Sequence, residues 1–197
     1  MKVRRCGLFG GTFDPPHYGH VAALRAAAST SRFDRIEVTV AGDPYLKSVD
    51  GAVRSASVRL AMARAAFEDL DLVVVSDREI RREGPSFTID TVRELLDDVE
   101  QVDLIVGADL LAQLDRWHEA ETLRTLVRVG VVPRPGAATV VPALWDCYEI
   151  PMEPVDLSSS FIRDIDLSSD DLKKFLPELV IPLYLGARGY SRHNGSS

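Results

Sequence analysis

Short apolar runs alternate with amphipathic stretches along most of this chain, and this alternation constrains the fold more than any other feature. The runs have the composition of buried strands and span residues 3–9, 36–40, 72–75, 102–106 and 126–132. Apolar residues recur at helical spacing between them, and the predicted core-facing stripes are Val21, Leu24 and Ala28, then Val58, Ala61, Met62 and Ala65, then Ile89, Val92, Leu96 and Val99. This order predicts an α/β fold: a Rossmann-like, doubly wound parallel sheet with helices on both faces and right-handed crossovers.

The length of 197 residues suits one domain, and we predict a single domain over residues 1–190. The alternation weakens beyond Gly136, where residues 145–150 fit a last strand and residues 158–164 fit a short helix. Residues 172–185 are expected to be mostly helical, with two prolines interrupting the helix. We therefore expect a small helical C-terminal subdomain at about 151–190, followed by a flexible tail at 191–197.

Charge and cysteine content narrow the class of protein. The chain carries 23 Lys and Arg against 30 Asp and Glu, a formal net charge of −7, so neither nucleic acid nor an anionic membrane is expected as a partner. Cys6 and Cys147 form neither a disulfide framework nor a metal-ligand spacing, and Cys6 is predicted to be a small core residue. The apolar run that ends at Gly10 is too short for a signal peptide, which predicts a cytoplasmic protein.

A polar corner joins the first predicted strand to the first predicted helix over residues 10–20. Gly10 and Gly11 lack a Cβ, so their backbone N–H groups can approach phosphate oxygens closely. The helix that follows directs its unpaired N–H groups at the same space, and His17 and His20 face it from one side of the first turn. A glycine-proline turn with two surface histidines is the structural alternative, but the combination predicts a polyphosphate site.

Other polar residues also follow predicted strands, at the ends where ligands bind in open α/β sheets. Residues 43–47, which include Lys47, follow the second strand. Residues 107–109 follow the fourth strand, and Arg134 follows the fifth. The predicted sheet therefore gathers its unusual polar residues at one edge.

A second polar corner lies far along the chain, at residues 157–163. Ser158, Ser159 and Ser160 precede an expected helix, and Arg163 follows one turn later. A single serine at such a position is best explained as a helix cap. Together with the arginine, the three serines also form a phosphate-binding set.

Both corners resemble motifs of one superfamily. Residues 10–20 resemble the signature of the HxGH nucleotidyltransferases, whose HxGH element is His17 to His20, and residues 157–163 resemble the element that holds the ATP phosphates opposite those histidines. The middle of the chain looks like nicotinate mononucleotide adenylyltransferase, the NAD-synthesis family of the superfamily. The matching stretches are Gly84 to Thr91, Gly107 to Asp109, Trp117 with Glu119 and Glu121, Val132 to Gly136, and the Leu-Pro at Leu176.

Each middle motif also has a structural interpretation. Ser86 or Thr88 could cap a helix, the turn at Gly107 could simply end a strand, and Trp117 could belong to the core. Three further arginines are interpreted as a solvated face of the protein and not as a binding site; they are Arg78, Arg81 and Arg82.

The resemblance implies a set of site residues and a reaction. The implied ATP-binding residues are Gly10, Gly11, Thr12, Phe13, His17, His20, Gly107, Asp109, Arg134, Ser158, Ser159, Ser160 and Arg163. The implied pyridine-nucleotide residues are Thr12, Phe13, Lys47, Thr88 and Trp117, and the implied catalytic residues are His17, His20, Lys47 and Arg163. The phosphate of nicotinate mononucleotide would attack the α-phosphorus of ATP, giving nicotinate adenine dinucleotide and pyrophosphate for NAD biosynthesis. Mg²⁺ would be bound through the ATP phosphates, so no protein metal site is expected.

Two departures from the family pattern leave the pyridine substrate less defined than the reaction. The family usually has Pro-Pro-His-Lys where this chain has Asp43 to Lys47, and His118 replaces an aromatic neighbour of the tryptophan. The alternatives are an adenylyltransferase for nicotinamide mononucleotide or phosphopantetheine, or a nucleotide sensor without turnover. The combination of Thr88, Asp109 and Trp117 favours nicotinate mononucleotide over phosphopantetheine. The sequence does not give the oligomeric state and leaves a homo-oligomer open.

Overall fold

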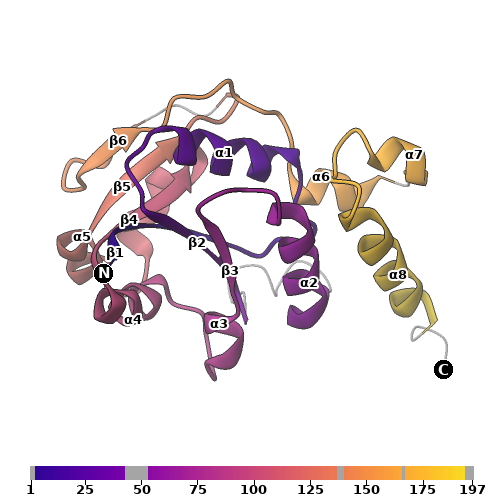
Figure 1. The fold of residues 1–197 in the computed structure, drawn as a ribbon, viewed down its shortest axis with the longest axis horizontal. Helices are drawn as coiled ribbons and strands as arrows, with labels where there is room; N and C mark the ends of the chain where they lie inside the picture. Colours follow the sequence, from indigo (N-terminus) through magenta and orange to yellow (C-terminus); the bar gives the residue numbers. More distant parts are fainter. Residues whose placement is uncertain (1–2, 43–52, 137–139, 166, 194–197) are drawn as a thin grey trace.

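The computed structural model describes residues 3–42, 53–136, 140–165 and 167–193 (Figure 1). Its elements are β1 (Val3–Gly11), α1 (Tyr18–Ser29), β2 (Arg35–Val40), α2 (Ala56–Phe67), β3 (Val73–Ser76), α3 (Arg78–Arg81), α4 (Thr88–Asp98), β4 (Val99–Gly107), the 3-10 helix η1 (Ala108–Arg116), α5 (Ala120–Leu126), β5 (Val127–Val132), β6 (Cys147–Glu149), α6 (Ser159–Asp164), α7 (Ser169–Leu172) and α8 (Val180–His193).

The strands form one six-stranded sheet in the order β3-β2-β1-β4-β5-β6, and every adjacent pair in it is parallel. The chain builds outward from β1 to β3 on one side, then crosses over and builds outward from β4 to β6 on the other. This reversal places a topological switch point between the carboxyl ends of β1 and β4, where such sheets bind ligands. The predicted Rossmann-like, doubly wound sheet is confirmed.

Helices cover both faces of the sheet (Figure 1). Successive strand residues point to opposite faces, and both faces carry apolar side chains that the helices bury. One apolar cluster joins the sheet to α1, α2 and the C-terminal helices, with Leu24, Phe67 and Tyr184 among its buried members. The other cluster joins the sheet to α4, η1 and α5, and it includes Cys6, which is fully buried as predicted. None of the described helices is long and apolar enough to cross a bilayer.

The buried face of α2 differs from the predicted stripe. Of the four predicted residues, Met62 is buried and Val58 and Ala65 pack partly buried against the core, but Ala61 is exposed, so its inclusion was wrong. The fully buried positions of the helix are Arg59, Met62, Ala63, Ala66 and Phe67. These residues also follow helical spacing, but their set begins with an arginine. A purely apolar pattern therefore finds the core-facing side of the helix but leaves out the buried arginine.

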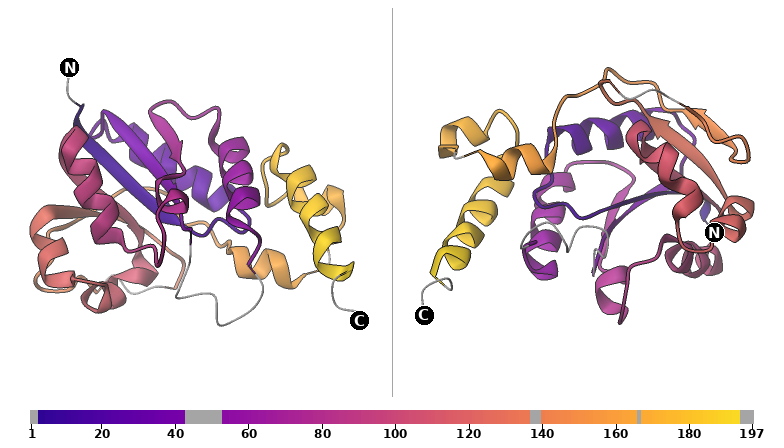
Figure 2. Two further views of the ribbon diagram at one scale, coloured as in Figure 1. Left: turned by 90° about the horizontal axis from the view of Figure 1, so that it is seen from below. Right: turned by 180° about the vertical axis from the view of Figure 1, so that it is seen from behind.

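The C-terminal segment packs against α2, and Figures 1 and 2 show α8 beside that helix in every view. Residues 172–185 are less continuous than expected, since α7 ends at Leu172 and α8 begins only at Val180. Pro182 does not interrupt α8, because it lies in the first turn, where its missing N–H is not needed. Helix α8 runs to His193, three residues into the segment that we expected to be a flexible tail.

Candidate active site

The first polar corner connects β1 to α1, with His17 as the N-cap of the helix. His17 is only 1% exposed, and its ring lies 3.8 Å from that of His20, centroid to centroid. The backbone N–H of His17 donates to Nδ1 of His20 at 3.1 Å. Because Nδ1 accepts this bond, neutral His20 carries its proton on Nε2 and presents a donor there. The corner thus combines an imidazole donor with a helix N-terminus.

The second polar corner lies directly against the first. The hydroxyl of Ser159 donates to the carbonyl oxygen of Pro15 at 2.8 Å, across 144 residues of sequence. The guanidinium of Arg163 donates to the carbonyl oxygen of Asp14 at 2.7 Å and to the hydroxyl of Ser160 at 3.2 Å. The two corners that resemble the superfamily motifs therefore face one space.

Arg134 joins the end of β5 to the end of β4 and to the second corner. Its Nη1 donates to the carbonyl oxygen of Leu157 at 3.2 Å, one residue before Ser158, which caps α6 through its side chain. Its Nε lies 3.6 Å from a carboxylate oxygen of Asp109. A Cβ on Gly107 would lie 2.4 Å from that same oxygen, so a side chain there would displace the Asp109 carboxylate.

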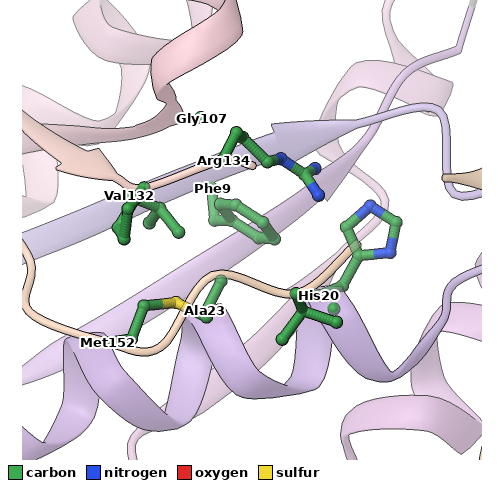
Figure 3. Close-up of a pocket in the computed structure, with 10 residues that line it drawn as sticks. Phe9, His20, Ala23, Gly107, Val132, Arg134 and Met152 are labelled. Carbon is green, nitrogen blue, oxygen red and sulfur yellow. The ribbon is translucent and has the colours of Figure 1, made fainter. Parts of the chain in front are cut away.

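A pocket opens between these groups at the carboxyl ends of β1, β4 and β5. It holds about 310 Å³ of empty space, part of it open to solvent. Figure 3 shows the guanidinium of Arg134 pointing toward the imidazole of His20, with the ring of Phe9 beside them. The lining residues are Phe9, Gly19, His20, Ala23, Gly107, Val132, Pro133, Arg134, Met152 and Val155. A flat, mostly apolar ring with a polar edge matches this shape and chemistry.

Two of the predicted pyridine-nucleotide residues, Thr88 and Trp117, lie on the face of the sheet opposite α1 and α2. Thr88 is the first residue of α4, and Trp117 ends η1 half-buried against the apolar cluster of that face. Their chain neighbours Phe87 and His118 stack with ring centroids 4.1 Å apart and 20° between the planes, which brings the two segments together. Lys47 lies outside the described residues.

Phe13 and Thr12 do not both present side chains to a ligand. The ring of Phe13 is 2% exposed and packs edge-on against His20, so it belongs to the core and only its backbone can face a ligand. The carbonyl oxygen of Thr12 accepts from Nη1 of Arg59 at 3.0 Å. Gly10 and Gly11 end β1 at the edge where the pocket opens.

Sequence reasoning missed three charged residues that fix this loop. Asp14 and Arg54 form an ion pair at 2.8 Å, and their side chains are 1% and 12% exposed. Arg59 is 1% exposed, and burial lowers its pKa from the usual value while the nearby Asp14 carboxylate opposes that shift. The helical spacing of Arg59 with Met62 and Phe67 is the sequence signal that could have identified it.

The interpretation of Arg78, Arg81 and Arg82 as a solvated face was wrong for two of them. Arg78 pairs with Glu37 and Glu94, and Arg82 pairs with Glu94, all between β2, α3 and α4; only Arg81 is exposed. Burial opposes the ionisation of Glu94, but hydrogen bonds from Arg82 and Arg78 outweigh it and hold its pKa below the usual value. These arginines fix the segment that leads into the turn before α4.

Metal ligands are not concentrated anywhere in the part of the chain that the structure describes. No group of three or more His, Cys, Asp or Glu side chains there could hold a metal ion.

Comparison with known proteins places this arrangement in a family. The sequence pattern of the cytidylyltransferase-like family matches residues 8–165. A probable nicotinate-nucleotide adenylyltransferase of Roseiflexus sp. (strain RS-1) is 43% identical over 175 residues, which are 88% of this chain and 86% of the relative. Its counterpart in Gemmatimonas aurantiaca is 35% identical over 199 aligned residues, 95% of this chain and 92% of the relative.

The fold has close neighbours among solved structures. The nicotinic acid mononucleotide adenylyltransferase of Plasmodium falciparum, complexed with NaAD, superimposes with a TM-score of 0.79 over 95% of this chain and 98% of that one. The identity is 19%, so this likeness concerns the fold alone.

Proposed function

This chain belongs to the nicotinate-nucleotide adenylyltransferases, within the cytidylyltransferase-like family, and we propose from its geometry how it joins nicotinate mononucleotide to the AMP moiety of ATP. The products are nicotinate adenine dinucleotide and pyrophosphate, and the reaction belongs to NAD biosynthesis. The observation that carries the proposal is the direct contact between the two polar corners, through Ser159 and Arg163.

The adenosine part of ATP is assigned to the pocket between β1, β4 and β5. Phe9 and Met152 offer apolar surface for the adenine ring, and Gly107 leaves room at the ring edge. The side chain of Asp109 is 57% exposed, so its carboxylate can accept a hydrogen bond from a ribose hydroxyl. Arg134 stands between this carboxylate and the second corner, where its positive charge favours the α-phosphate.

The triphosphate is assigned to the space between the two corners. His20 presents an Nε2 donor, and the N-terminus of α1 adds its positive dipole end. We assign His17 to the α-phosphate, and His20 with the hydroxyls of Ser159 and Ser160 and the guanidinium of Arg163 to the β- and γ-phosphates. Among the described residues, Arg163 donates from Nη1 to Asp14 and from Nη2 to Ser160, and a guanidinium carries five N–H groups, so it can also donate to phosphate oxygens.

The pyridine nucleotide is assigned to the segments that Phe87 and His118 bring together. The backbone N–H groups at Thr88, in the first turn of α4, are donors suited to the nicotinate carboxylate. Trp117 offers an aromatic face for the pyridine ring, and Lys47 is assigned to the attacking phosphate. The pyridine ring and the adenine ring would then approach the triphosphate from opposite sides of the switch point.

The chemistry needs positioning and charge stabilisation more than proton transfer. A phosphate monoester is already an anion near neutral pH, so it can attack the α-phosphorus without a general base. Charge that develops on the α-phosphate and on the leaving pyrophosphate is stabilised by the imidazoles, hydroxyls and guanidinium around it. Nucleotidyltransferases of this kind use a divalent metal ion, and we propose Mg²⁺ bound through the triphosphate, where it would neutralise negative charge.

The decisive experiment offers the protein each mononucleotide in turn. The protein is incubated with ATP, Mg²⁺ and nicotinate mononucleotide, nicotinamide mononucleotide or phosphopantetheine, and pyrophosphate and dinucleotide are measured. We expect fast turnover with nicotinate mononucleotide. Turnover with another acceptor alone contradicts the substrate assignment, and binding of ATP with no turnover identifies a nucleotide sensor. A cytoplasmic location and a homo-oligomer remain proposals, which cell fractionation and gel filtration test.

A further inference from the structure

Arg59 is a buried cation whose guanidinium donates to three backbone carbonyl groups among the residues that the structure describes. It donates from Nε to Arg54 at 2.9 Å, from Nη1 to Thr12 at 3.0 Å and from Nη2 to Gly42 at 3.3 Å. These carbonyls belong to the segment just before α2, to the turn after β1 and to the turn after β2. One planar group therefore fixes three backbone segments at the carboxyl edge of the sheet.

Gly42 connects this cluster to the opposite half of the site. Its carbonyl oxygen accepts from Arg59, while its backbone N–H donates to the hydroxyl of Ser86 at 3.0 Å. A Cβ at this position would lie 2.4 Å from the carbonyl oxygen of Glu79, so no side chain fits between the turn after β2 and α3. Hydrogen bonds to Arg59 and Ser86 and close packing against the Glu79 carbonyl therefore fix the position of Gly42.

Ser86 serves this contact and not the helix that follows it. Helix α4 begins at Thr88 with Phe87 as its N-cap, and no side chain caps it. The hydroxyl of Ser86 instead accepts from a residue 44 positions earlier in the chain. Ser86 thereby fixes the turn that leads to Thr88 against the turn after β2.

We propose that Arg59 and Ser86 are positioning residues that act through Gly42 to set the distance between the ATP-binding corner and the pyridine-nucleotide turn. The chain of contacts runs from Thr12 through Arg59 and Gly42 to Ser86, two residues before Thr88. None of these side chains needs to touch a substrate. The inference rests on the proposed assignment of residues 10–20 to ATP and of the Thr88 turn to the mononucleotide.

Loss of the contacts at Gly42 should affect binding of the mononucleotide more than binding of ATP. ATP keeps a second support, because Ser159 and Arg163 hold the first corner independently of Gly42. The Ser86 turn loses its hydrogen bond to the turn after β2 when the hydroxyl is removed. Loss of that hydroxyl should therefore weaken binding of the mononucleotide and leave binding of ATP largely unchanged.

The test is steady-state kinetics of Ser86→Ala and Arg59→Lys with nicotinate mononucleotide and ATP varied separately. For Ser86→Ala we expect KM for the mononucleotide to rise on the order of threefold to tenfold, the range of one lost hydrogen bond, with KM for ATP unchanged. Arg59→Lys keeps the charge but cannot reach three carbonyls, so it should raise the same KM. In the double variant the rise should be smaller than the product of the single effects, because both act through Gly42.

The matched controls are Ser168→Ala and Arg64→Lys. Ser168 also accepts from a backbone N–H, at 3.2 Å, but it caps α7 away from the site, and Arg64 is an exposed arginine of the same helix as Arg59. Both should keep wild-type kinetics. Unchanged KM for the mononucleotide in Ser86→Ala, or an equal rise in both KM values, overturns the inference even if Arg59→Lys does not fold. Absence of turnover in the wild-type protein overturns the proposed function instead.

Discussion

Replacing Asp14 with asparagine should strongly destabilise the protein, because it breaks a buried ion pair and leaves a cation behind. The carboxylate of Asp14 lies 2.8 Å from Nη1 of Arg54, with side chains that are 1% and 12% exposed. Asparagine keeps the volume and can still accept from the Arg54 backbone N–H, at 3.1 Å from the carboxylate. The change therefore isolates the charge of this residue.

The magnitude follows from the burial of the pair. Removing one partner of a buried pair costs about 3–5 kcal/mol, because the remaining charge loses its counter-charge. The Arg54 guanidinium would keep its contact with the ring of Tyr184, 4.2 Å away, but would lose the carboxylate. In a chain of this size each kcal/mol corresponds to about 2–4 °C, so the unfolding midpoint should fall by roughly 6–20 °C. Thermal unfolding followed by circular dichroism measures this shift.

A matched exposed pair provides the control. Asp77 pairs with Arg81 at 3.0 Å, but the two side chains are 36% and 72% exposed, so Asp77→Asn should cost less than about 1 kcal/mol. The double variant Asp14→Asn with Arg54→Met should recover part of the loss, since it removes the uncompensated charge. If Asp14→Asn lowers the midpoint no more than Asp77→Asn does, the reasoning from burial is refuted.

Three further variants test the site and the sheet. His17→Ala should lower kcat by on the order of a hundredfold or more, as loss of a charge-stabilising donor does, with an unchanged circular dichroism spectrum; normal turnover would show that His17 is not needed. Ser159→Ala removes the bond to Pro15 and should raise KM for ATP on the order of threefold to tenfold in pyrophosphate-release kinetics, whereas an unchanged value contradicts its assignment. Burial, then a hydrogen bond to the Asp103 carboxylate, raises the pKa of Tyr148 above its ordinary value of 10.0, so the phenol ionises first in the unfolded chain. Its contribution to the unfolding free energy is complete below about pH 10 and is lost as the pH rises further; urea titrations should show a shallower alkaline loss for Tyr148→Phe, and an equal slope in both proteins would exclude this origin.

Much of the site was predictable because its motifs are local. The glycines at the end of β1, the histidines at the start of α1 and the serines at the start of α6 each occupy consecutive or helically spaced positions. The switch point also follows from the order of strands and helices alone. The meeting of the two corners could be expected from the resemblance, and the bond from Ser159 to Pro15 then supplies it in the structure.

Buried charge was the feature that local patterns concealed. Arg59 lies on the buried face of α2, where a hydrophobic stripe would exclude it, because its partners are carbonyl groups of Thr12, Gly42 and Arg54. Similarly, the sequence around Arg78 is typical of a surface residue, but in the fold Arg78 pairs with Glu37 of β2 and Glu94 of α4. The cost of burying such groups is offset only by partners that the fold supplies.

The sequence by itself determined the alternation of strands and helices, the edge of the sheet at which polar groups gather, and the two corners that contact each other there. Only the tertiary structure decided that an arginine belongs to the buried face of α2, which serine caps a helix and which one holds a distant backbone turn, and how Gly42 connects Arg59 to Ser86. The physical reason is that periodicity reports the preference of each segment for water, whereas a buried hydrogen bond or ion pair depends on a partner from elsewhere in the chain.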